Sequence, residues 1–123
     1  WIMSRRAHQN DHVGPYTIPA GDTALVCPYL LHRDPANWPA PDRFDPDRFA
    51  PGGPKERLHS YAYLPFGGGP RLCIGNQFAL MEMQILLALF VRRFPIKATD
   101  NQSIMPKPLI TLRPNQAIQA LLA

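Results

Sequence analysis

The chain has 123 residues, a net charge of +4 and 46% hydrophobic residues, so its length suits a single domain core. Its 15 prolines and 8 glycines, in a sequence of that hydrophobic content, indicate long ordered loops and argue against intrinsic disorder. No run of lysine or arginine exceeds two residues, so nucleic-acid binding is not expected.

Residues 1–34 predict short strands followed by a short helix. Polar residues and a glycine–proline pair make residues 8–15 a turn. Residues 29–33 suit about one and a half helical turns before an Asp-Pro pair stops them. The strands that we predict here are residues 1–3, 16–18 and 23–28, which together indicate a small antiparallel sheet.

Residues 35–65 are rich in proline and aromatic residues and predict a long loop, or meander. A loop of this length inside a compact domain is usually functional. Stiff prolines and buried aromatic rings can hold such a loop without regular structure. We therefore expect an ordered meander that leads into the next segment.

Residues 66–75 form a loop around a single cysteine. Three consecutive glycines and a proline exclude a regular helix or strand here. The apolar run that follows predicts that Cys73 sits at a helix N-terminus, where unpaired backbone N–H groups and the helix dipole stabilise a thiolate. Arg71 adds a positive charge two residues earlier. The loop therefore predicts a thiolate offered to a metal.

Residues 76–94 predict one long helix that is apolar nearly all round, so we expect it to be buried. Residues 94–98 predict a strand, and residues 100–108 a polar loop. Residues 109–112 and 117–122 predict a C-terminal hairpin around Pro114-Asn115. Strands thus account for most of residues 95–123.

Cys73 has an alternative interpretation as an ordinary buried cysteine, which is the usual fate of a free thiol. A single cysteine does not suit zinc or an iron–sulfur cluster, which need about four protein ligands. The other cysteine, Cys27, lies in a different context, so no disulfide is expected. The four histidines lack ligand spacing.

The pattern Phe-x-x-Gly-x-Arg-x-Cys-x-Gly, from Phe66 to Gly75, resembles the haem-binding signature of cytochrome P450. Ala79 and Glu82 also lie where that family tends to place these residue types. The meander resembles the family's pattern as well, at residues 32–35, 38–39 and 46–49. The resemblance implies an α+β fragment that is the C-terminal part of a single domain with the mainly-α cytochrome P450 fold.

The resemblance also implies a cofactor, haem b (iron protoporphyrin IX), and assigns residues to it. Cys73 would be the axial ligand of the iron, with no further catalytic residue in this chain. Arg71 would pair with a haem propionate, because a planar guanidinium suits a carboxylate. Arg5 is the second propionate candidate, and its neighbour Arg6 competes for that role.

Other positions acquire roles by the same resemblance. Phe66 would pack beside the cysteine sulfur and limit solvent there. Arg48 resembles the family arginine that locks the meander to a Glu-x-x-Arg pair on a preceding helix, but that pair is not in this sequence, so Arg48 has no visible partner. The small residues that would lie against the macrocycle are Gly69, Gly75 and Ala79.

By resemblance, the whole enzyme would be a monooxygenase that inserts one atom of O2 into an organic substrate. Its electrons would come from a redox partner such as a ferredoxin, a flavodoxin-type protein or a reductase. In this chain, substrate contacts could come from Ile2, Met3 and the hairpin near Ile110. We expect no membrane segment here and a cytoplasmic location.

An alternative of a different class is a truncated, cofactor-free and non-catalytic fragment, or an interaction module. The first residues resemble the middle of a chain, and one wall of a haem pocket does not make an enzyme. A carbon monoxide spectrum of the reduced protein separates the two hypotheses.

Overall fold

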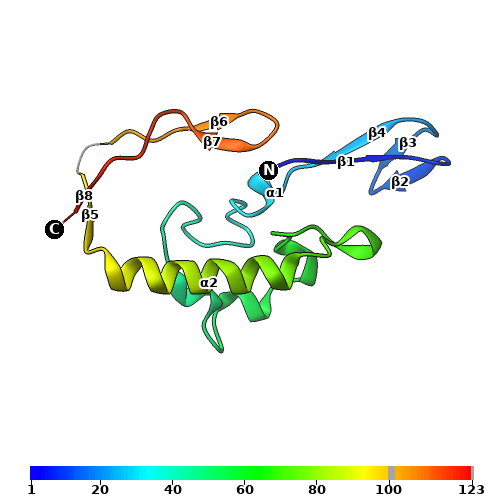
Figure 1. Ribbon diagram of the computed structural model, residues 1–123. Helices are drawn as coiled ribbons and strands as arrows, with labels where there is room; N and C mark the ends of the chain where they lie inside the picture. Colours follow the sequence, from blue (N-terminus) through cyan, green and yellow to red (C-terminus); the bar gives the residue numbers. More distant parts are fainter. Residues whose placement is uncertain (100–101, 123) are drawn as a thin grey trace. The chain divides into compact units, whose positions relative to one another are not determined.

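The computed structural model describes residues 1–99 and 102–122, which form two compact units on either side of the Pro70–Arg71 bond. The helices and strands are β1 (Met3–Arg6), β2 (Asp11–Val13), β3 (Tyr16–Ile18), β4 (Thr23–Val26), α1 (Pro28–Leu31), α2 (Asn76–Arg93), β5 (Ile96–Ala98), β6 (Pro106–Pro108), β7 (Leu112–Pro114) and β8 (Ala120–Leu122) (Figure 1). The mixture of one long helix with short antiparallel strands confirms the predicted α+β class.

The strands of the first unit form two separate antiparallel pairs, not one sheet. β1 pairs with β4, with Met3 opposite Val26, and β2 pairs with β3, with Asp11 opposite Ile18. β3 confirms the strand predicted at 16–18. Two other predictions were wrong: β1 runs on through polar residues to Arg6, and β2 lies inside the predicted turn. Both strands are largely exposed, so backbone pairing forms them without an apolar pattern.

The short helix and the meander follow the sequence prediction closely. α1 begins at Pro28, a residue suited to a first helical turn, and covers four residues. Residues 35–65 contain no α-helix or strand in this fully described stretch. Three short 3-10 turns punctuate the meander instead, at Pro46–Phe49, Pro54–Arg57 and Ser60–Ala62. The Asp45 side chain caps the first of them by accepting from the Asp47 backbone N–H.

A cluster of rings holds the meander together. Trp38 is buried, and its ring centroid lies 6.0 Å from that of Phe49 and 5.8 Å from that of Tyr63. Tyr63 also contacts Phe49, at 5.0 Å, and His32, at 4.9 Å between centroids. Aromatic pairs at these separations stabilise beyond the area that they bury. The cluster therefore supplies the ordered loop that its composition predicts.

Arg48 directly precedes Phe49 of this cluster in the chain and is only 8% exposed. Its guanidinium donates to the carbonyl oxygens of Pro39, at 2.6 Å, and Ala40, at 2.7 Å. Ala40 has a φ of 47°, in the left-handed region that alanine rarely adopts. The sequence showed no partner for Arg48; the structure corrects this, because the partners are main-chain carbonyls and carry no sequence signal.

His32 should make the stability of the first unit depend on pH. Its Nε2 accepts a hydrogen bond from the Leu64 backbone N–H, at 2.8 Å. Burial, and then the charge of Arg33, lower the pKa of His32 from the ordinary 6.5. Because the folded-state pKa is depressed, its contribution is full above about pH 6.5 and is lost as pH falls below that value toward the folded pKa.

Urea unfolding at a series of pH values between about 5 and 8 measures this contribution. We expect the free energy of unfolding to fall toward acid pH in the wild type, and to fall less in His32→Asn. His12→Asn removes an exposed histidine and is the matched control. An identical pH slope in the wild type and His32→Asn would refute the effect.

The second unit contains α2 and the C-terminal strands. α2 begins and ends at Asn76 and Arg93, close to the predicted 76–94, and Arg92 and Arg93 suit the negative end of its dipole. The expected burial is not found: within the described part of the chain, no residue of α2 is buried. The described elements of this chain do not cover its apolar side chains, which gather on every face.

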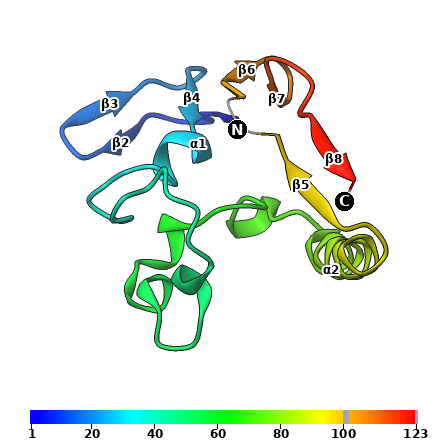
Figure 2. The same ribbon diagram turned by 90° about the vertical axis from the view of Figure 1, so that its left-hand side faces the viewer.

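The C-terminal strands pair differently from the prediction. β6 pairs with β7, with Pro108 opposite Leu112, so the hairpin turn lies at residues 109–111 and not at Pro114-Asn115. β8 pairs with β5, with Ala98 opposite Ala120, and Figure 2, which looks along α2, shows these two strands side by side. Of the predicted loop 100–108, residues 100 and 101 lie outside the described residues, as does residue 123, and 106–108 form β6.

Candidate functional site

Glycine shapes the loop before α2. Gly67 and Gly69 have φ angles of 78° and 67°, in the left-handed region that suits glycine. A Cβ added at Gly68 would lie 2.9 Å from the Tyr61 ring and 3.2 Å from a Leu64 methyl group. A short 3-10 turn spans Gly69–Arg71. Glycine is therefore the residue that fits this path without strain or crowding.

Cys73 is an exposed, free cysteine in this loop. Its carbonyl accepts the Asn76 backbone N–H, at 3.3 Å, and Gly75 is the N-cap of α2. Cys73 therefore lies in the turn before the helix, two residues ahead of its N-cap, and not in the first helical turn. Since a helix dipole acts mainly near the first turn, it stabilises a thiolate at Cys73 less than it would one inside that turn. The glycine loop is the element that positions the thiol.

The donor set at this position is one thiol. Among the described residues, no group of three or more His, Cys, Asp or Glu side chains could hold a metal. A single thiolate suits a metal whose other ligands come from a macrocycle. The donor chemistry of the loop thus fits a haem iron.

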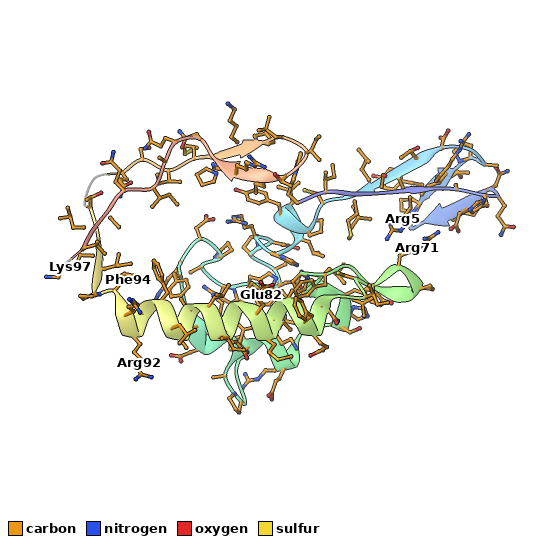
Figure 3. All side chains as sticks on the ribbon, in the orientation of Figure 1. Arg5, Arg71, Glu82, Arg92, Phe94 and Lys97 are labelled. Atoms are coloured by element: carbon orange, nitrogen blue, oxygen red, sulfur yellow. The ribbon has the colours of Figure 1, made fainter. Side chains whose placement is uncertain are left out.

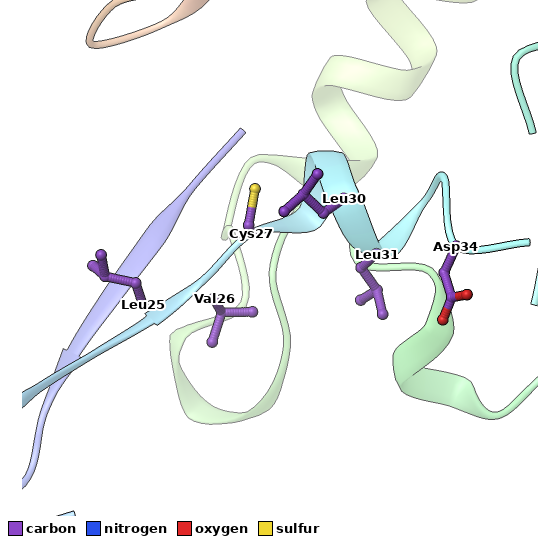
Figure 4. Close-up of a pocket in the computed structure, with 6 residues that line it drawn as sticks. All are labelled: Leu25, Val26, Cys27, Leu30, Leu31 and Asp34. Carbon is purple, nitrogen blue, oxygen red and sulfur yellow. The ribbon is translucent and has the colours of Figure 1, made fainter. Parts of the chain in front are cut away.

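Cys27, in contrast, has a structural role. Its Sγ donates to the Trp1 carbonyl oxygen, at 3.3 Å, and it lines an open pocket in the first unit (Figure 4). The other residues that line this pocket are Leu25, Val26, Leu30, Leu31 and Asp34. Asp34 is occupied as well, because its carboxylate accepts from the Ala36 backbone N–H and the Asn37 amide. The two cysteines therefore have different environments, as their sequence contexts predict.

The candidate arginines differ in what they bind. Arg71 is exposed, and no hydrogen bond or ion pair joins its side chain to another described residue; Figure 3 labels it on the loop. In β1, Arg6 donates from Nε to the Gly21 carbonyl at 3.2 Å and so ties one end of the β1–β4 pair. Arg5 donates to the adjacent Ser4 carbonyl. Arg5 bonds only to its sequence neighbour, whereas Arg6 bonds across the strand pair. Arg5 is therefore the better candidate to bind an external carboxylate.

The small positions leave space beside the loop. A Cβ added at Gly69 or Gly75 would meet no atom within 4 Å. Ala79 is half-buried in the first turn of α2, and Phe66 is half-buried in the turn between Pro65 and Gly67. Open space beside two glycines is compatible with a flat group lying against the backbone.

Sequence reasoning missed two arrangements. One is the carbonyl-binding role of Arg48, described above. The other is a set of side-chain hydrogen bonds made by Gln102, which links the segments on either side of the β6–β7 hairpin. A glutamine in a polar loop gives no signal by itself, and its partners become apparent only once the β5–β8 pairing is known.

The family model of cytochrome P450 matches residues 2–121 of this chain. The chain belongs to the cytochrome P450 family. It is 39% identical to cyclooctatin synthase of Streptomyces melanosporofaciens over 91% of this chain, and 39% identical to mouse cytochrome P450 4V2 over 95%. It spans 24% and 22% of the length of these two relatives.

A solved structure agrees with this assignment. Cyanobacterial CYP120A1 with bound retinoic acid matches 98% of this chain with a TM-score of 0.90 and 28% identity, and the match covers 28% of that protein. Cytochrome P450 enzymes are haem-thiolate monooxygenases as a family. None of the helices that the structure describes is long and apolar enough to span a membrane.

Proposed function

We propose that the protein is a haem-thiolate monooxygenase, and that this chain is the C-terminal part of its single cytochrome P450 domain. The observation that carries the proposal is Cys73, a free and exposed thiol in a glycine-shaped loop with the family's signature around it. The reaction would insert one oxygen atom into an organic substrate, as the family's enzymes do.

The residues present fit haem b. Cys73 would bind the iron, and Phe66 would keep water from the sulfur. Arg71 and Arg5 would each bind a propionate, because a guanidinium donates two parallel hydrogen bonds to a carboxylate. The small side of the loop and helix, at Gly69, Gly75 and Ala79, would lie against the macrocycle. Haem, when bound, supplies the oxygen-activating chemistry, in which thiolate ligation favours O–O cleavage.

A reduced carbon monoxide difference spectrum of the protein as its gene encodes it tests this function. We expect the strongly red-shifted Soret band that thiolate ligation gives. Absence of any haem absorbance from the purified protein would instead support the cofactor-free fragment or interaction module. A haem band without the red shift would contradict thiolate ligation by Cys73.

Substrate contacts in this chain would come from apolar residues. Ile2 and Met3 open the β1 segment, and Ile110 lies fully exposed at the turn of the β6–β7 hairpin. Exposed isoleucine at the tip of a hairpin suits an apolar ligand. The identity of the substrate is not proposed beyond a small organic molecule. We propose a cytoplasmic location.

A redox partner would meet the exposed, basic 3-10 turn Pro54–Arg57. Lys55 and Arg57 both extend from it, separated by Glu56. We expect the double change Lys55→Glu with Arg57→Glu to slow reduction by an acidic ferredoxin or flavodoxin-type protein at low salt. The difference should shrink as salt rises, since the Debye length is about 8 Å at physiological ionic strength.

Stopped-flow reduction at a series of salt concentrations checks this expectation. Lys107→Glu with Arg113→Glu changes the net charge equally on the β6–β7 hairpin and is the control. Equal slowing in the two double variants would show an effect of net charge alone and remove the turn from the docking surface.

A further inference from the structure

Side-chain amides bridge the two chain segments that lead to and from the β6–β7 hairpin. Asn115 binds Met105 twice: its Oδ1 accepts the Met105 backbone N–H, at 3.0 Å, and its own N–H donates to the Met105 carbonyl, at 2.9 Å. The Gln116 amide donates to the Ser103 carbonyl, at 3.3 Å. These bonds join the outgoing segment 102–105 to the returning segment 115–119 (Figure 1).

Gln102 makes the most extensive of these bridges. Its Oε1 accepts the Gln119 backbone N–H, at 2.7 Å. Its Nε2 donates to the Gln119 carbonyl, at 2.7 Å, and to Thr99, at 3.1 Å to the carbonyl and 2.6 Å to Oγ1. The two bonds to Thr99 are partly buried, whereas the two bonds to Gln119 are exposed. The oxygen and the NH2 group of the Gln102 amide therefore both bond to the backbone of Gln119.

The register shows what this amide replaces. Ala98 lies opposite Ala120, so Thr99 and Gln119 are the next pair of the β5–β8 ladder. The Thr99 backbone N–H donates to the Gln119 carbonyl at 3.4 Å, as a ladder pair should. The reciprocal bond is missing, because the Gln119 N–H turns to the Gln102 amide, which in turn donates to Thr99. The amide is thus inserted at the Thr99–Gln119 pair, where the β5–β8 ladder ends, and the Gln116–Ser103 and Asn115–Met105 bonds follow it toward the hairpin, called here the β6–β7 arm.

The Gln102 amide fixes the base of an arm whose tip is apolar. Beyond it the two segments run to β6 and β7 and end in the turn at 109–111, where Leu109 is half exposed and Ile110 fully exposed. Two-stranded ribbons are marginal by themselves, so the direction of such an arm depends on its base. A small rotation at the base becomes a larger displacement at the tip.

We infer that Gln102 is a positioning residue: its amide fixes the base of the β6–β7 arm and so sets where the tip at Leu109 and Ile110 meets an apolar ligand. The part that concerns the ligand rests on the proposed monooxygenase function. The part that concerns the arm rests on the hydrogen bonds alone.

The first test is hydrogen exchange in the protein as its gene encodes it. Gln102→Leu keeps the size of the side chain and loses all four bonds, so we expect faster exchange of the β6–β7 backbone amides and unchanged exchange in α2. Gln119→Leu is the matched control, because only the backbone of Gln119 bonds to the Gln102 amide. Gln102→Glu keeps the acceptor, loses the donor and should fall between the two.

The second test is ligand binding to the haem, followed by the Soret band. Imidazole is small and binds the iron alone, whereas 1-octylimidazole adds an apolar tail. We expect Gln102→Leu to weaken 1-octylimidazole binding by about three- to tenfold, the scale of a lost hydrogen bond, and to leave imidazole binding unchanged. An unchanged ligand-free Soret spectrum confirms that the variant folds.

The outcomes separate the two hypotheses. If Gln102→Leu and Gln102→Glu both exchanged at the wild-type rate, the Gln102 amide would not fix the base of the arm. Faster exchange with unchanged 1-octylimidazole binding would overturn the positioning role. A wild-type protein whose Soret band responds to neither ligand would refute the proposed function, while the exchange result would still decide whether Gln102 fixes the arm.

Discussion

Replacing Cys73 with serine should abolish the thiolate-type carbon monoxide spectrum of the protein. A serine hydroxyl is not ionised at neutral pH, so the iron would lose its anionic axial donor, whereas a cysteine thiol ionises readily. The exposed loop position tolerates the smaller oxygen, because Cys73 packs against no core. We therefore expect a folded protein whose haem is lost or lacks the red-shifted band.

Cys27→Ser is the matched control for this prediction. Cys27 donates to the Trp1 carbonyl, and a serine hydroxyl can make the same bond. Its variant should keep the wild-type spectrum. If Cys73→Ser also kept it, Cys73 would not be the ligand; if Cys27→Ser alone lost it, the roles of the two cysteines would be reversed.

The sequence predicted correctly the elements that depend on neighbouring residues, namely the long helix and the glycine loop. The span of α2 follows from a run of good helix formers bounded by glycine before it and proline after it. The loop before it follows from three consecutive glycines, two of which adopt left-handed angles. The signature residues from Phe66 to Gly75 could be assigned roles because their types and spacing match one family.

Pairing between distant segments could not be predicted in the same way. The sequence favoured a hairpin around Pro114-Asn115, yet Pro114 ends β7 and Asn115 binds Met105 instead. β8 pairs with β5, more than 20 residues away, and three-residue strands are too short to show an alternation that identifies a partner. The burial of α2 was misjudged for a related reason. An apolar sequence indicates that a helix packs against other apolar surface, but it does not identify the element that provides that surface.

Arg48 illustrates a further limit, because its partners are backbone atoms. The Arg48 side chain is buried, and its guanidinium donates to the carbonyls of Pro39 and Ala40. A third and longer contact reaches the Arg43 carbonyl, at 3.4 Å. The turn that it closes contains Ala40 in a left-handed conformation, which persists only when its surroundings hold it. Arg48 therefore acts as the internal support of the meander.

We expect Arg48→Met to destabilise the protein by roughly 2–4 kcal/mol. Methionine keeps the apolar stem but leaves two carbonyls without their charged donor, and each bond of this kind is worth about 1.5–3 kcal/mol. Because Pro39 and Ala40 are exposed, water can bind their carbonyls in the variant and offset part of the summed loss. Lysine, with a single ammonium in place of a fork, should recover only part of the loss. Urea unfolding measures the change in the free energy of unfolding, provided that its dependence on urea concentration (the m value) is the same in both proteins.

Arg43→Met is the control for this prediction, because the Arg43 side chain is exposed and only its carbonyl takes part in the turn. We expect that variant to lie within about 0.5 kcal/mol of the wild type, as surface substitutions usually do. A loss in Arg48→Met no larger than in Arg43→Met would mean that the ring cluster of Trp38, Phe49 and Tyr63 holds the meander without the arginine. A large loss that Arg48→Lys fully restores would show that the buried charge, and not the forked geometry, supports the turn.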